Sequence, residues 1–191
     1  DVHRVVRRQM KSGIRDRVYA DLWDIKEPTG HIFSDQTGQF PVQSSGGNKY
    51  VMIVYNYDSN SILAEAMKSR TAHEMLRAYK AIHSYLAKRG LKPKLQRLDN
   101  KASNKLKEYM RQQQIDFQLA PPHIHRRNAA ERAIRTWKNH FIAGLASTDT
   151  HFPLHLWDRL IPQAVTTLNL LRKSKLNPRM SADTQLNGMY D

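Results

Sequence analysis

The 191-residue chain contains no cysteine. Disulfide bonds are therefore excluded, and so is every zinc site that needs thiolate ligands. Acidic residues are scarce, because 17 Asp and Glu stand against 31 Lys and Arg, which gives a formal net charge of +14. Long apolar runs are also missing, since the longest, residues 50–55, is far too short to span a bilayer. No signal segment is visible, so we expect neither secretion nor a membrane partner.

Positive charge is what the chain has in excess. A large cationic surface favours a polyanion, and nucleic acid is the first candidate; a basic protein with no nucleic-acid ligand is the alternative. The length suits one domain, with a basic N-terminal arm or helix over residues 1–28 ahead of a core over 29–191. Because the chain begins with Asp1 rather than Met, we expect a piece of a longer polypeptide.

The first half of the core reads as three strands. Residues 31–42, 50–57 and 62–67 are rich in apolar and β-branched side chains, and short polar turns separate them. The turn at 44–48 contains Gly46 and Gly47, and the next turn is 58–60. Three strands joined by short turns predict an antiparallel meander.

The second half alternates helices and strands. Thr71 and Glu74 are spaced as in a helix-capping box, and that helix is expected to end at Gly90. A strand at 95–99, a helix at 103–113 and a strand at 115–119 follow, then a long helix after the Pro121-Pro122 break. A last helical segment over 153–173 is expected to kink at Pro162. The order predicts an α/β fold: a mixed five-stranded sheet with helices on both faces. Trp137 and Trp157 lie on apolar stripes and are predicted core residues.

Three acidic residues stand out by their positions. Asp35 lies within the first strand, Asp99 at the carboxyl end of the fourth, and Glu131 in the first turns of the long helix. If the first and fourth strands are neighbours, their backbones lie about 4.8 Å apart and the two aspartates can share a metal ion. Carboxylates are the ligands that Mg²⁺ and Mn²⁺ prefer. Solvated surface charges are the alternative reading of any such triad.

The long helix carries a second pattern. Arg127, Glu131, Arg135 and Lys138 are spaced by four, four and three residues, so they share one helix face. Salt bridges along a solvated helix explain this spacing. A metal-binding acid whose neighbours hold DNA phosphates explains it equally well.

These segments resemble copia-type retrotransposon integrases of the DDE superfamily. Residues 35–41 (DQTGQFP) are similar to the first acidic motif of that family, in which Gly follows the Asp three residues later. Leu98-Asp99-Asn100 resembles the second motif, and residues 128–132 (NAAER) resemble the third. The resemblance spans about residues 31–190 and is strongest to diatom copia-like elements. Lys101 and Ala129 stand where the family often has glycine.

The resemblance implies an RNase H-like fold and metal-dependent chemistry on DNA. It implies 3′-end processing and strand transfer into target DNA, with Asp35, Asp99 and Glu131 as catalytic ligands of Mg²⁺ or Mn²⁺, two ions in all. Arg127, Asn128, Arg135 and Lys138 would hold the DNA. The resemblance also implies a homo-oligomer in the full-length protein, located in the nucleus and in the retroelement particle.

Two other functions remain open. One is a non-catalytic DNA-binding domain derived from an integrase, and the other is an RNase H-like nuclease, for which Asp158 is the candidate fourth acid. Three further interpretations also stay open. Asp21 and Asp24 compete for the first acidic position. His123 and His125 either bind zinc or lie in a loop that contacts DNA or water. Asp58 is expected to cap a turn.

Overall fold

The computed structural model describes residues 27–98, 103–119 and 129–188. The predicted arm over 1–28 lies almost wholly outside these ranges, as do Asp21, Asp24, His123 and His125. The elements in chain order are β1 His31–Gln36, β2 Tyr50–Asn56, β3 Ile62–Met67, α3 Ala72–Ala87, β4 Leu95–Leu98, α4 Asn104–Gln112, β5 Asp116–Leu119, α5 Ala129–Ala146, the 3-10 helix η2 Leu154–Leu160, α6 Ile161–Leu170 and α7 Ala182–Asn187.

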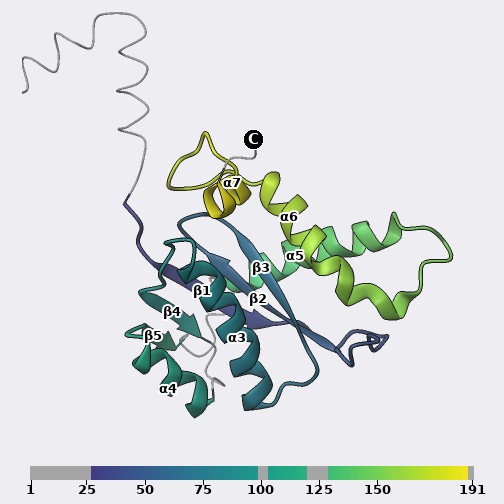
Figure 1. Ribbon diagram of the computed structural model, residues 1–191, viewed down its shortest axis with the longest axis horizontal. Helices are drawn as coiled ribbons and strands as arrows, with labels where there is room; N and C mark the ends of the chain where they lie inside the picture. The colour runs from purple at the N-terminus through teal and green to yellow at the C-terminus, as the bar shows by residue number, and fades with distance from the viewer. Residues whose placement is uncertain (1–26, 99–102, 120–128, 189–191) are drawn as a thin grey trace, which may run out of the picture.

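The sheet has five strands in the order β3-β2-β1-β4-β5. β1 and β2 are antiparallel, as are β2 and β3, whereas β4 runs parallel to both β1 and β5. The predicted mixed sheet, with its three-strand meander, is therefore confirmed (Figure 1). β1, β3, β4 and β5 all end on one side of the sheet, which we call the carboxyl end. α3 and α4 each begin there.

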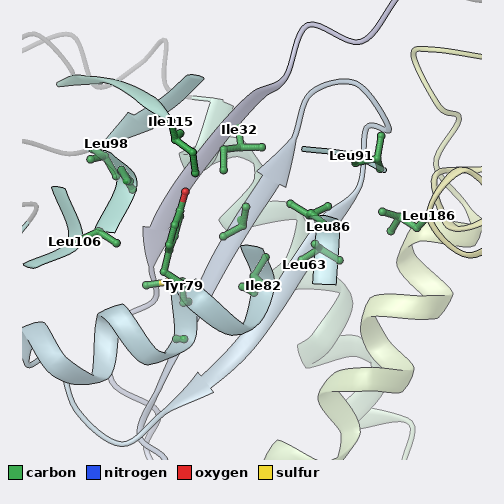
Figure 2. Packing of buried hydrophobic residues seen from close by; sticks show 14 of the residues in the cluster. Ile32, Leu63, Tyr79, Ile82, Leu86, Leu91, Leu98, Leu106, Ile115 and Leu186 are labelled. Atoms are coloured by element: carbon green, nitrogen blue, oxygen red, sulfur yellow. The ribbon is translucent and has the colours of Figure 1, made fainter. Parts of the chain in front are cut away.

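α3 and α4 cover one face of the sheet, and their core is visible in Figure 2. Every second strand residue points to this face, because side chains alternate along a strand. Helical spacing brings Tyr79, Ile82 and Leu86 of α3 onto Ile32 and neighbouring strand residues. At 16 residues α3 is also well capped, since Glu74 N donates to Thr71 Oγ1.

α5, η2 and α6 cover the opposite face, so helices lie on both faces as predicted (Figure 1). The core here is aromatic. Trp137 is 0% and Trp157 2% exposed, which confirms both as core residues. Phe40 stacks on Trp157 with ring centroids 4.3 Å apart, and Trp137 stacks on Phe141 at 4.7 Å. Phe40 comes from the loop after β1, so this core also fixes that loop.

Three predicted details are wrong. β1 ends at Gln36 rather than at residue 42, because the following loop leaves the sheet to pack on η2. Pro162 does not kink a helix; it lies in the first turn of α6, where a missing N–H costs no hydrogen bond. The Glu74 carboxylate accepts from Lys68 N instead of closing the capping box. Within the described ranges, no helix is both long and apolar enough to cross a membrane.

Candidate metal-dependent active site

The central pair of strands, β1 and β4, organises the candidate site. They pair in parallel, with Phe33 opposite Arg97, so the condition that the first and fourth strands are neighbours is met. Asp35 lies two residues beyond Phe33, near the carboxyl end of β1. β4 ends at Leu98. Asp99 is the next residue in the chain and lies outside the described ranges.

Asp35 belongs to the sheet face that α5 covers. It pairs with Ile53 of β2, and both Ile53 and Phe33 belong to the core on the α5 side. Because side chains alternate along β1, Asp35 shares the face of Phe33. The side chain is half-buried, and its Oδ1 accepts a hydrogen bond from Gln36 N at 2.7 Å. The backbone therefore holds one of the two carboxylate oxygens.

Glu131 lies in the first turn of α5 and is exposed. α5 packs against β1 and β2 through the stripe that includes Ala133, Trp137 and Phe141. Asp35 and the helix that carries Glu131 are thus on the same side of the sheet. No cluster of three or more acidic or histidine side chains suited to a metal ion occurs among residues 27–98, 103–119 and 129–188. Asp99 lies outside these ranges.

The predicted DNA-binding residues divide into two groups. Arg135 and Lys138 are exposed on α5, one to two turns after Glu131. Arg127 and Asn128 precede α5 and are not among the described residues.

One cation near these strands escaped the sequence analysis. Arg97 of β4 is exposed, and its guanidinium lies 5.5 Å from the centre of the Phe33 ring, on the α5 face. It precedes Asp99 by two residues. The alternation of Gln96, Arg97 and Leu98 was the signal that could have found it, because it places Arg97 on the face opposite the buried Leu98.

A buried polar network joins β1 to β4 on the α3 side. Gln96 is 0% exposed. Its Nε2 donates to Ser34 Oγ at 2.9 Å, and its Oε1 accepts from the Tyr79 hydroxyl at 3.3 Å. Burial raises the pKa of Tyr79, so this hydroxyl stays a neutral donor. The network ties Ser34, the residue before Asp35, to β4, the strand that ends one residue before Asp99.

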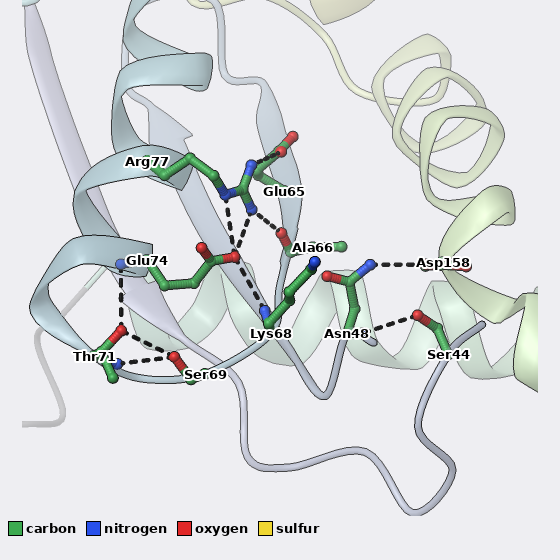
Figure 3. A network of polar contacts seen from close by, with 10 residues as sticks. All are labelled: Ser44, Asn48, Glu65, Ala66, Lys68, Ser69, Thr71, Glu74, Arg77 and Asp158. Atoms are coloured by element: carbon green, nitrogen blue, oxygen red, sulfur yellow. Dashed lines mark hydrogen bonds and ion pairs between the residues drawn. The ribbon is translucent and has the colours of Figure 1, made fainter. Parts of the chain in front are cut away.

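The loop between β1 and β2 is anchored at both of its ends. Thr37 N donates to Val51 O at 2.9 Å, and the Arg70 guanidinium donates to Thr37 O at 2.6 Å. Further along, Trp157 Nε1 donates to Val42 O at 2.9 Å. Figure 3 shows the last anchor, in which Asn48 Nδ2 donates to Asp158 Oδ2 at 2.8 Å. Asp158 thus holds the loop that follows the Asp35 strand.

Asp58 has a different structural role from the one predicted. Its carboxylate accepts from Thr29 N, from Thr29 Oγ1 and from Gly30 N at 2.7–2.9 Å. It therefore holds the segment that enters β1 instead of capping its own turn. Gly30 has φ +71°, and a Cβ there would lie 2.7 Å from Lys94, so this junction needs glycine.

Comparison with solved structures identifies the class of fold, the RNase H-like fold of retroviral integrase catalytic cores. No family model matches the chain, and no curated protein sequence matches it. A chain in the cryoEM structure of the simian T-cell lymphotropic virus intasome with PP2A regulatory subunit B56 gamma superposes with a TM-score of 0.65 at 17% identity. That match covers 84% of this chain, which spans 55% of the length of the matched chain.

Isolated catalytic cores match along nearly their whole length. The BIV integrase core gives a TM-score of 0.58 at 15% identity and covers 83% of this chain and 93% of its own. The HTLV-2 integrase core in complex with magnesium, in its trimeric form, gives 0.59 at 20% identity and covers 83% and 96%. The TM-scores establish a shared fold, and at these low sequence identities they establish the fold alone.

Proposed function

We propose that this chain is the catalytic core of a copia-type retroelement integrase, over residues 29–191, preceded by a basic DNA-binding arm. The observation that carries the proposal is the arrangement of β1, β4 and α5. β1 holds Asp35 on the face that α5 covers, α5 carries Glu131 in its first turn, and the strand paired with β1 runs directly into Asp99. The HTLV-2 core of the same fold was solved with magnesium, which supports this interpretation.

The donor atoms suit a hard divalent cation. Asp35, Asp99 and Glu131 offer only carboxylate oxygens, which Mg²⁺ and Mn²⁺ prefer, and the chain has no thiolate. We infer that these residues hold two ions, which when bound activate the attacking oxygen and stabilise the leaving one.

The protein's own groups would bind and orient the DNA. Arg135 and Lys138 extend the Glu131 face with positive charge, which suits phosphates on either side of the scissile bond. Arg127 and Asn128 would add contacts from the segment before α5. In the first step water attacks a phosphodiester near the element end and frees a 3′-hydroxyl. In the second, that hydroxyl attacks a target phosphodiester and releases a new 3′-hydroxyl.

Metal-dependent cleavage of a labelled duplex tests this proposal. We expect native protein to cut with Mg²⁺ or Mn²⁺, and Asp35→Asn and Glu131→Gln each to reduce the rate by about a hundredfold or more. Both substitutions keep shape and remove charge. Asp116→Asn is the matched control, because Asp116 is exposed at the start of β5, away from the carboxyl end of the sheet. Unchanged cleavage by either variant would refute the site assignment.

The same assay separates the other functions. Protein that binds duplex DNA but cuts with neither metal would support a binding-only domain, and preferential cutting of RNA–DNA hybrids would support a nuclease. The proposal further includes homo-oligomers and a location in the nucleus and the element's particle. Dimeric and trimeric forms of the HTLV-2 core support the first of these.

A further inference from the structure

A basic groove lies between α3 and α4, on the sheet face opposite α5. It encloses about 480 Å³, and helix α4 forms most of its wall. Leu76 and Lys80 of α3 line the other side. The groove is thus built from different elements than the Asp35 and Glu131 face.

The charge in this groove is strongly one-sided. Lys80, Lys105 and Lys107 line it together with a single ion pair, in which Arg111 lies 3.5 Å from Glu108. No ion pair involves the three lysines within the described ranges. Lys80 and Lys105 are exposed and Lys107 is half-buried. Three lysines without a carboxylate partner attract phosphate groups.

Tyr109 lines the floor of the groove and is held by packing and a hydrogen bond. The Tyr109 hydroxyl is 3.0 Å from His83 Nδ1, and the Tyr109 ring packs edge-on against Tyr79 at 6.1 Å. Lys80 Nζ lies 4.9 Å from the same ring. Burial lowers the pKa of His83, so the imidazole adds hydrogen bonding and no charge at neutral pH. Lys80 is thus positioned over a packed and hydrogen-bonded aromatic ring, and ordering it on a ligand costs less side-chain entropy.

The groove begins at the carboxyl end of the sheet. α3 and α4 both start there, and the Arg70 guanidinium just before α3 contacts Thr37, two residues after Asp35. A duplex whose scissile phosphate lies at that end has a basic path along α3 and α4. We propose that this groove binds the sugar–phosphate backbone of duplex DNA through Lys80, Lys105 and Lys107, outside the acidic site. The inference rests on the proposed function for its ligand.

Salt-dependent binding without divalent metal tests the groove. Affinity for a short fluorescent duplex is measured in EDTA between about 50 and 200 mM KCl for native protein and for the triple variant Lys80→Gln, Lys105→Gln, Lys107→Gln. The matched control removes the same charge through Lys88→Gln, Lys92→Gln and Lys173→Gln. Those lysines are exposed, and Lys88 and Lys92 lie beyond the other end of α3. Circular dichroism checks that both variants are folded.

We expect the groove variant to lose up to about eightfold in affinity per phosphate contact at 0.1 M salt, and the slope of log K against log salt to become shallower by about 0.9 per contact. The control should stay within about threefold of native. Equal losses of DNA affinity in both variants would show that affinity follows net charge alone and would overturn the proposal that the groove binds DNA. A native chain that does not bind duplex DNA would overturn it too. Because no metal is present, loss of cleavage activity cannot mimic either result.

Discussion

Replacing Gln96 with leucine should destabilise the protein although leucine is apolar, of similar size and suited to a core. Gln96 is fully buried between β1, β4 and α3. Gln96→Leu removes the acceptor of the Tyr79 hydroxyl and the donor to the Ser34 hydroxyl, and both groups are buried. Each orphaned hydroxyl costs about 1–3 kcal/mol. The buried apolar leucine offsets part of this, so we expect a net loss of about 1–4 kcal/mol.

A rescue variant separates polar loss from packing loss. Tyr79→Phe and Ser34→Ala in the Gln96→Leu background also remove the two hydroxyls that lost their partner; the Arg97 carbonyl, which accepts from Gln96 Nε2 at 2.8 Å, loses that bond in both variants. Because deleting all partners of a buried hydrogen bond is close to neutral, the triple variant should recover most of the stability.

Urea unfolding followed by tryptophan fluorescence measures both effects. The single variant should lower the midpoint while leaving the denaturant slope unchanged. A triple variant whose loss equals or exceeds that of the single variant would refute the reasoning, because the cost would then come from packing. Metal-dependent cleavage adds a functional readout, since the network joins β4 to β1, the strand that carries Asp35.

Three further predictions concern stability. Trp137→Phe should cost less than Trp157→Phe, because Trp157 Nε1 donates to a loop carbonyl whereas Trp137 Nε1 is buried with no partner among the described residues; the reverse order in urea unfolding would contradict this. Asn169→Ala should lower the free energy of unfolding by about 2–4 kcal/mol in the same assay, because the N–H and C=O of Ile62 lose the hydrogen bonds of 2.9 and 3.0 Å that the Asn169 amide makes. A loss under about 0.5 kcal/mol would contradict this. Burial lowers the pKa of His83 from 6.5, so the folded state binds fewer protons, and His83 lowers stability as the pH falls below about 6.5. His83→Gln should therefore lose less stability than native protein between about pH 7 and 5.

The strands were predictable because their signals are local. Apolar and β-branched runs, with short polar turns between them, define β2 and β3 to within a residue. The face of Asp35 also follows from local alternation once Phe33, two residues earlier, is recognised as an apolar neighbour. The parallel contact of β1 with β4 is different. It joins His31 to Leu95, which are separated in the chain by two strands and a helix. No local pattern predicts that contact, so the sequence analysis could state it only as a condition.

The polar contacts that hold the site were not predictable. Gln96 lies in a four-residue strand, and nothing in the spacing shows that Ser34 and Tyr79 are its partners. The loop after β1 is held by Trp157, more than a hundred residues away, whose Nε1 donates to Val42 O. Such contacts are set by tertiary packing, which overrides strand propensity.

The described acidic residues differ in what holds them, and this difference bears on function. Asp58 accepts from Thr29 and Gly30, and Asp158 from Asn48, so their charges are used within the fold. Glu131 projects from the first turn of α5, and no ion pair to it occurs within the described ranges, although the chain carries +14. An acid that stabilises the fold is expected inside such a network. One that faces solvent beside the Asp35 strand, followed on its helix by Arg135 and Lys138, is better placed to bind an external cation and its phosphate ligand.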